Sequence, residues 1–147
     1  MPLHSNYESN LAEAKEFELF VSDTLAHSLA ILPCVFRSKH YQTLYGESLT
    51  GVEIKLDKQF RATGNLFIET EESPHESREK SPAGIYHHTS PWLFVIGDNH
   101  TIWVFSTTCL KREHISGKHR NVRTPTASGF LLSVGVADTI AARKWEA

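Results

Sequence analysis

The sequence has few of the residues that mark secreted or membrane-bound proteins. It holds two cysteines, Cys34 and Cys109, in 147 residues. Two thiols are too few for the disulfide framework of a small extracellular domain. No apolar run approaches the roughly 20 residues of a membrane-spanning helix, and the first ten residues lack the basic start and apolar stretch of a secretory signal. We therefore expect a cytoplasmic, intracellular protein with reduced thiols and no membrane partner.

A large excess of charge of either sign is also absent, since the formal net charge is −2. Nucleic-acid-binding domains often carry a basic excess that neutralises phosphates, and the total shows none. The charges are unevenly spread, however. The range Glu69–Glu79 holds five glutamates and one arginine, whereas Lys111–Arg123 holds five basic residues, two histidines and one glutamate. A basic segment of this kind can bind a polyanion, although a solvated loop explains it equally well.

Several catalytic and metal-binding signatures are missing too. Neither cysteine has the surroundings of a nucleophile, and no G-x-S-x-G motif or glycine-rich phosphate loop occurs. Nine histidines suggest zinc, but no Cys-x-x-Cys or His-Glu-x-x-His spacing accompanies them. Adjacent histidines on a strand also point to opposite faces. These observations argue against a zinc site built from His87, His88, His114 and His119.

The length fits one domain, residues 1–147, that can build its own hydrophobic core. Apolar spacing predicts a helix over Leu11–Leu32, with Asn10 as its cap and Pro33 as its end. Alternating patterns and turn residues predict the strands that follow. These strands are expected at Tyr41–Glu47, Gly51–Asp57, Asn65–Glu71, Trp92–Ile96 and Thr101–Phe105.

Turn residues indicate how the strands connect. The letters RATGN lie between the second and third strands and suggest an antiparallel hairpin, and Gly97, Asp98 and Asn99 suggest another between the last two. A short helix is expected over Thr107–His114, and a second helix from about Val134. The order of elements describes an α/β or α+β protein in which a sheet packs on helices.

Charged residues recur inside the second and third strands. Side chains alternate across a strand, so Glu53, Lys55 and Asp57 share one face, opposite Val52 and Ile54. Glu69 falls on the corresponding polar face of the next strand. If those faces align across the hairpin, like charges gather on both sides of Lys55, and a bound cation would relieve them. Mg²⁺ prefers such hard oxygen ligands and can assist hydrolysis of a phosphodiester.

An acidic residue followed by Glu-x-Lys in a strand resembles the signature of the PD-(D/E)xK nuclease superfamily. Glu53, Ile54 and Lys55 match the second half of this motif, and Glu47 matches the upstream acid, where Asp is commoner. The longer string GVEIKLDKQFRATGNLFIE is similar to small phage and bacterial members. Another match, Glu13-Ala14-Lys15, falls on the predicted helix and is attributed to chance.

The resemblance implies a restriction-endonuclease-like core, with a mixed central sheet flanked by helices, and a nuclease that uses Mg²⁺ or Mn²⁺ to hydrolyse DNA. It implies that Glu47, Glu53 and the Ile54 carbonyl bind the metal while Lys55 positions the attacking water. Many members act as dimers, so a homodimer is compatible with it. Further acids considered are Glu18, Asp57 and Glu69. DNA, rather than RNA, would contact the basic residues Lys39, Lys58, Arg61, Lys111, Arg112, Lys118, Arg120 and Arg123.

Two other interpretations remain open. A non-catalytic DNA-binding or assembly protein could keep the same fold, with DNA affinity that does not need Glu53 or Lys55. A structural α+β protein could simply expose these charges on a solvated antiparallel sheet, with Asp57 and Glu69 pairing with Lys58 or Arg61. The aromatic residues of the last hairpin, Trp92 among them, fit sheet packing better than base stacking.

Overall fold

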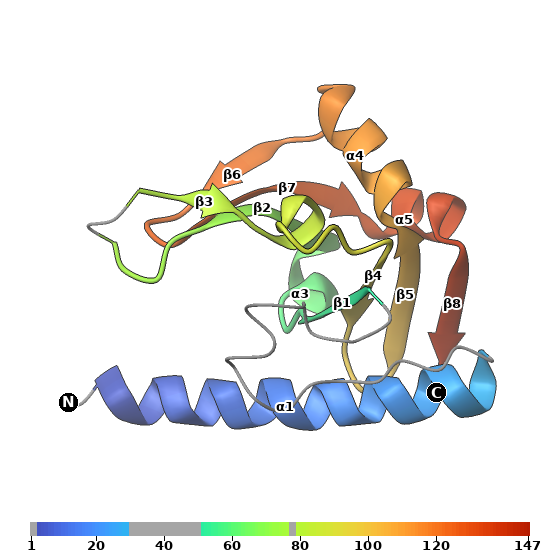
Figure 1. Cartoon of the computed structure of the whole chain (residues 1–147). Coiled ribbons are helices and arrows are strands. Elements are labelled where there is room, and N and C mark those ends of the chain that lie inside the picture. The colour runs from blue at the N-terminus through green and yellow to red at the C-terminus, as the bar shows by residue number, and fades with distance from the viewer. Residues whose placement is uncertain (1–2, 30–50, 77–78) are drawn as a thin grey trace.

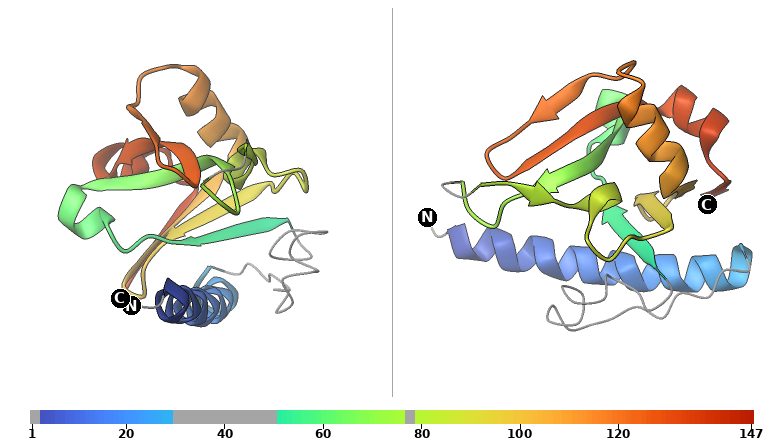
Figure 2. Two further views of the ribbon diagram at one scale, coloured as in Figure 1. Left: turned by 90° about the vertical axis from the view of Figure 1, so that its left-hand side faces the viewer. Right: turned by 45° about the horizontal axis from the view of Figure 1, so that its top comes forward.

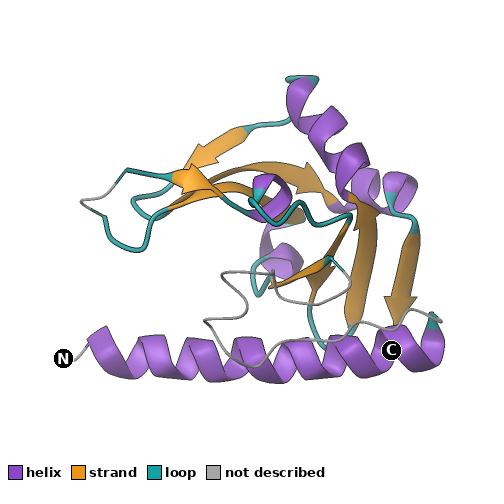
Figure 3. Cartoon of the chain, viewed as in Figure 1, coloured by secondary structure: helices purple, strands orange, loops and turns teal. Residues whose placement is uncertain are grey.

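The computed structural model describes residues 3–29, 51–76 and 79–147. Helices and strands are interspersed along the chain, as Figures 1 and 3 show. In chain order the elements are α1 (Leu3–Ser28), β1 (Val52–Leu56), α3 (Phe60–Thr63), β2 (Asn65–Glu72), β3 (Ser81–Pro82), the 3-10 helix η1 (Gly84–Tyr86), β4 (Leu93–Gly97), β5 (Thr101–Ser106), α4 (Thr107–Ile115), β6 (Asn121–Arg123), β7 (Ala127–Ser133), α5 (Val134–Ile140) and β8 (Arg143–Glu146).

The strands form two sheets. The first sheet has the order β1-β4-β5-β8 and is mixed, because β1 runs parallel to β4 while the other neighbours are antiparallel. The second sheet has the order β3-β2-β7-β6 and is antiparallel throughout. The expected mixed α/β architecture is therefore confirmed. No helix in the described ranges combines the length and apolarity needed to cross a bilayer.

Two buried clusters hold the layers together. On one face of the first sheet, Val52 and Ile54 pack against Phe17, Val21 and Leu25 of α1, the long helix along the bottom of Figure 1. The second cluster joins the other face of the first sheet to the second sheet and to α3, α4 and α5. In both views of Figure 2 the second sheet lies farther from α1 than the first sheet does. It contains Phe60, Leu66, Ile68, Ile85, Phe94, Ile96, Trp103, Phe105, Leu110, Phe130, Leu132 and Ala137.

Strand alternation places two charged residues on the side of the second cluster. In β1, Val52 and Ile54 face α1, so Glu53 and Lys55 face the opposite way. Their partners across the parallel β1–β4 pair are Phe94 and Ile96, both fully buried in the second cluster. The charged face of β1 thus continues an apolar core face, which is not the solvated sheet surface of the structural interpretation.

The hairpin predicted between the second and third strands is wrong. β1 and β2 belong to different sheets, and the residues between them form α3. Phe60 enters the core, and Gly64 ends the helix with a positive φ of 71°, which glycine adopts at little cost. The letters of a turn therefore mark a helix end, after which the chain crosses from one sheet to the other.

The first helix begins at Leu3, so Asn10 lies within it and is not its cap. Pro33 and the strand expected at Tyr41–Glu47 lie outside the described residues. The hairpin of β4 and β5, helix α4 and the start of α5 agree with prediction. Strands β6, β7 and β8 were not predicted. The basic range Lys111–Arg123 begins with the end of α4, as expected, and continues as a turn and strand β6, where a loop was expected.

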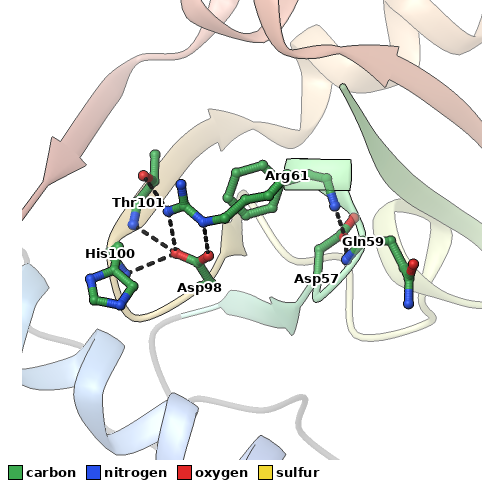
Figure 4. A network of polar contacts seen from close by, with 7 residues as sticks. Asp57, Gln59, Arg61, Asp98, His100 and Thr101 are labelled. Atoms are coloured by element: carbon green, nitrogen blue, oxygen red, sulfur yellow. Dashed lines mark hydrogen bonds and ion pairs between the residues drawn. The ribbon is translucent and has the colours of Figure 1, made fainter. Parts of the chain in front are cut away.

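Bonds between α3 and the β4–β5 turn fix the crossing of the chain (Figure 4). The Arg61 guanidinium donates to both carboxylate oxygens of Asp98, at 2.6 and 3.0 Å. Burial disfavours the Asp98 charge, but Arg61 and the backbone N–H groups of His100 and Thr101 together hold the pKa of this carboxyl below its ordinary value. This network ties α3 to the turn that follows β4, the strand next to β1.

Candidate active site

Three charged side chains meet between the two sheets. Lys55 Nζ on β1 lies 3.2 Å from Glu53 Oε1 of the same strand and 3.2 Å from Glu69 Oε1 of β2. The Glu53 and Glu69 side chains are only 5% and 16% exposed, and that of Lys55 is 29% exposed. We call these residues the carboxylate–lysine cluster. The sequence predicted that these residues lie together, but it assumed that their strands form a hairpin. In the structure Glu69 contacts Lys55 from the second sheet.

The charge on Glu69 is largely buried and faces the ammonium of Lys55. Burial raises the pKa of Glu69, and the positive charge of Lys55 opposes this rise. Glu69 Oε1 is buried and has no well-aligned hydrogen-bond donor among the described residues, and its contact there is the 3.2 Å ion pair with Lys55. A buried carboxylate oxygen that lacks hydrogen bonds is costly. Such an atom is suited to accept a cation or a donor group from a ligand.

The backbone around Glu69 is irregular. The register of β2 against β7 shifts between Glu69 and Glu71, which marks a β-bulge. Gly84 of η1 approaches so closely that a Cβ there would lie 2.2 Å from the Glu69 carbonyl oxygen. Gly84 also has a positive φ of 55°. A bulge and a glycine contact therefore set the position of this carboxylate.

Asp57 has a structural role and does not join the cluster. Its Oδ1 accepts hydrogen bonds from the backbone N–H groups of Gln59 and Phe60, at 2.8 and 3.0 Å, and its Oδ2 accepts one from Phe67 at 3.0 Å. Figure 4 shows Asp57 turned toward the start of α3. Both oxygens are thus used to join the end of β1 to α3 and β2. Neither Asp57 nor Glu69 pairs with Lys58 or Arg61, as the structural interpretation proposed.

His87 is a neighbour of the cluster that sequence reasoning did not assign to it. Burial lowers the pKa of His87, and the charges of Glu53 and Lys55 act on its ring in opposite directions. The backbone N–H of Thr89 donates to His87 Nδ1, and Thr89 Oγ1 lies 2.7 Å from the same nitrogen. A neutral ring with its proton on Nε2 satisfies this arrangement. No spacing in the sequence links His87 to Glu53, since the fold alone joins them.

The cluster opens into a cleft of about 480 Å³. Lys55 and Glu69 lie in its wall, with Phe67 between the cluster and Asn65. A neighbouring hollow of about 670 Å³ shares Asn65 and Leu131 with this cleft. Lys118 and Arg120 line that hollow. The two hollows therefore adjoin at Asn65 and Leu131, and we call the pair the groove, with the carboxylate–lysine cluster in one half and two cations in the other.

The predicted DNA-contacting residues differ in exposure and in their partners within the protein. Lys58 bonds to Glu13 at 2.8 Å and Arg61 to Asp98, so both have acidic partners within the protein. Lys39 lies outside the described residues. Lys111 is half-buried, with its ammonium 5.5 Å from the centre of the Tyr86 ring. The remaining four, Arg112, Lys118, Arg120 and Arg123, are exposed.

Other predicted ligands do not join the cluster in the described residues. Glu18 is buried on α1, which packs on the face of the first sheet opposite Glu53 and Lys55. Ile54 directs its side chain toward α1, and metal binding by its carbonyl stays a prediction. Glu47, the predicted upstream acid, lies outside the described residues. His114 and His119, weighed as zinc ligands, contact Tyr86 and Glu113 respectively.

The donor set provides part of a magnesium site. Residues 3–29, 51–76 and 79–147 contain no group of three or more His, Cys, Asp or Glu side chains placed to hold a metal ion. Glu53 and Glu69 supply two hard oxygen ligands, and the Lys55 ammonium now lies 3.2 Å from one oxygen of each. Mg²⁺ usually keeps several waters and needs only one or two carboxylates together with a substrate phosphate. The two acids fit such a hydrated ion.

Comparison of the chain with protein-family models, with curated proteins and with solved structures found no match to any of them. The case for a function therefore depends on the geometry of the site and the sequence motif.

Proposed function

We propose that this protein is a divalent-metal-dependent nuclease that hydrolyses DNA phosphodiester bonds. One observation carries the proposal. The Glu-x-Lys pair faces the core side of its strand, where Lys55 meets a second buried carboxylate from the other sheet. Buried charges are costly, and clusters of them in clefts are enriched at functional sites. The resemblance to PD-(D/E)xK nucleases, with a restriction-endonuclease-like core, gives the cluster its chemistry.

Each residue of the cluster has a role in this proposal. Glu53 and Glu69 hold the metal through their carboxylates, with Glu47 as the further acid that the motif supplies. Lys55 orients the attacking water and offsets the negative charge that develops on the phosphate. When bound, Mg²⁺ or Mn²⁺ would polarise the phosphoryl oxygen and lower the pKa of water. His87, held neutral by its surroundings, could exchange a proton at Nε2.

The groove suggests how DNA would lie. The DNA phosphates would pass from the cluster along Asn65 and Leu131 to Lys118 and Arg120. Arg112 and Arg123, nearby in sequence, add exposed positive charge. Such contacts position the backbone without reading its sequence. The proposal includes a cytoplasmic location and a homodimer that reaches both strands of a duplex.

Cleavage assays test this function. Purified protein is incubated with linear duplex, branched and single-stranded DNA in Mg²⁺, in Mn²⁺ and in EDTA. We expect cleavage that requires the metal and falls at least about 100-fold in Lys55→Ala and Glu53→Gln. The matched control is Lys15→Ala in the second Glu-x-Lys sequence, where the lysine is exposed on α1. Absence of cleavage on every substrate, together with no thermal shift on adding metal, would reject the proposal.

One feature favours a second candidate, a non-catalytic DNA-binding protein. Lys55 already pairs with both described carboxylates of the cluster, so the site is partly neutralised without a metal. This candidate predicts salt-sensitive DNA binding that survives Lys55→Ala and Glu53→Gln, with no cleavage in either metal. Equal activity loss in the two variants at unchanged DNA affinity would select the nuclease instead.

A further inference from the structure

A third hollow, of about 570 Å³, lies apart from the groove. It is formed where the ends of β2, β6 and β7 meet η1 and α4, and it shares no lining residue with either half of the groove. Its volume falls within the roughly 300–1,000 Å³ that small-molecule sites occupy. Nothing in the proposed nuclease chemistry uses it.

Aromatic rings form one wall of this hollow. The Tyr86 hydroxyl and His114 Nδ1 share a hydrogen bond of 2.8 Å, and burial raises the pKa of the Tyr86 phenol, which therefore stays protonated. The His114 ring in turn stacks on Phe130, with 13° between the ring planes. Gly129 adds no side chain to this wall. The two linked rings present a preorganised surface for a planar ligand.

Polar groups without protein partners face the same space. Ser128 Oγ is buried and has no hydrogen-bond partner in the part of the chain that the structure describes. Arg123 is paired with Ser128 across the β6–β7 ladder, so both side chains point to one face of the sheet, and Asn121 lies two residues along. Within the described ranges, neither the Asn121 amide nor the Arg123 guanidinium bonds to another side chain. Three residues with hydrogen-bonding side chains thus line the hollow, with Asn121 and Arg123 exposed at its rim and Ser128 Oγ buried in its wall.

Positive charge collects at the edge of the hollow. Lys80 is held near β6 by donating to the Thr124 carbonyl. Loss of hydration lowers the pKa of Lys80, the charge of Arg123 lowers it further, and the charge of Glu71 raises it, so the two cations repel each other beside one nearby carboxylate. An anion between them would relieve that repulsion. Glu71, also in the lining, could accept a hydrogen bond from a ring amino group or a sugar hydroxyl.

We propose that this hollow binds a nucleotide. The base lies against Tyr86 and His114, Asn121 and Ser128 bond to its polar edge, and Arg123 with Lys80 holds the phosphate. A free mononucleotide and one nucleotide of a nucleic-acid strand share this chemistry. The inference goes beyond the proposed cleavage, because it concerns binding at a place that the carboxylate–lysine cluster does not reach.

Calorimetric titration in EDTA tests the proposal without any cleavage. The probes are AMP, GMP, CMP and UMP, with inorganic phosphate for comparison. We expect saturable binding of at least one nucleotide, weakened about tenfold or more in Arg123→Ala and also weakened in Asn121→Ala. Ser128→Ala should weaken binding while leaving the melting temperature equal or higher, because it removes a buried group that has no partner among the described residues. Arg143→Ala, an exposed arginine on β8 outside the hollow and outside the proposed DNA contacts, is the matched control.

A second arm separates the two sources of the ligand. A fluorescent single-stranded oligonucleotide is titrated into Lys55→Ala protein in EDTA, and anisotropy is measured. Binding of the oligonucleotide but of no mononucleotide, with reduced affinity in Arg123→Ala and Ser128→Ala, assigns the hollow to a strand. The proposal is overturned if neither probe binds, if all three hollow variants bind as the wild type does, or if inorganic phosphate binds as tightly as the nucleotides. Failure of the nuclease proposal would leave these results unchanged.

Discussion

Lys55 holds one positive charge between two carboxylates that come from different sheets. Removing the ammonium would leave Glu53 and Glu69 facing each other with no cation between them. Replacing Lys55 by Met keeps most of the apolar stem, so the effect of the charge can be read separately from that of packing.

We expect Lys55→Met to lower the free energy of unfolding by about 1–3 kcal/mol, below the usual cost for a fully buried pair because Lys55 is partly exposed. Urea denaturation at neutral pH measures it. The double variant Lys55→Met with Glu69→Gln should recover part of this stability, since the two changes act on one ion pair. Strict additivity of the two single effects would show that Lys55 and Glu69 are not coupled.

The raised pKa of Glu69 makes stability depend on pH. Its native pKa lies above the ordinary value of 4.5, so between these values the native state binds more protons than the unfolded state. Stability therefore falls as pH rises through this window and is lowest above it. Glu69→Gln lacks this fall, so its advantage over the wild type should be absent at acid pH and grow to a plateau above the native pKa. Melting temperatures across the pH range measure it, and a pH-independent difference would contradict the assignment.

At the scale of elements, Gly84 and Gly117 offer a matched pair. Both have positive φ, of 55° and 69°. A Cβ at Gly84 would collide with the Glu69 backbone, whereas one at Gly117 would meet no described atom within 4 Å. Gly117→Ala should cost about 1 kcal/mol for its backbone conformation alone. Gly84→Ala should cost distinctly more, and should also reduce any DNA cleavage because it displaces Glu69. Equal decreases of stability in the two variants, measured by urea denaturation, would show that η1 can shift to accommodate the added methyl group without moving β2.

Asp57 gives a second test at this scale. Asp57→Ala leaves three backbone N–H groups without their acceptor, and we expect the free energy of unfolding to fall by about 2–4 kcal/mol. Asp57→Asn keeps one oxygen acceptor and should be less destabilised. Urea denaturation compares the two. A metal-dependent thermal shift that persists in Asp57→Asn would agree with a structural role for Asp57. Complete loss of this shift at near-wild-type stability would show that Asp57 binds the metal.

Local patterns predicted the elements better than their pairing. Alternation found β1, β2 and the β4–β5 hairpin, and it put Glu53 and Lys55 on one face. It failed at Asp57 because alternation holds only while the strand continues, and β1 ends at Leu56. The β1–β2 pairing failed because Gly64 ends a short helix as readily as it makes a turn. The charges of Glu53 and Lys55 act on His87 because of the tertiary fold, so no local signal could reveal this.

For the whole molecule, the groove predicts how DNA affinity responds to salt. The double variant Lys118→Ala with Arg120→Ala removes the two exposed cations at its far end. Binding should weaken on all DNA sequences alike, and the slope of log affinity against log salt should become shallower by about one for each phosphate that is no longer neutralised. Fluorescence anisotropy at several salt concentrations measures the slope. Lys15→Ala is the control, and an unchanged slope in the double variant would place DNA elsewhere.

The two glutamates of the cluster lie on separate sheets, and no strand pairing in the described ranges joins β1 to β2. A cation held by both would therefore act as a crosslink between two halves of the fold. Metal binding would stabilise the packing of one sheet on the other as well as the site itself. Unfolding would become more cooperative as metal is added, and the melting temperature would rise with metal concentration. Occupancy of the site could then be followed in the intact protein by thermal denaturation, with no substrate present.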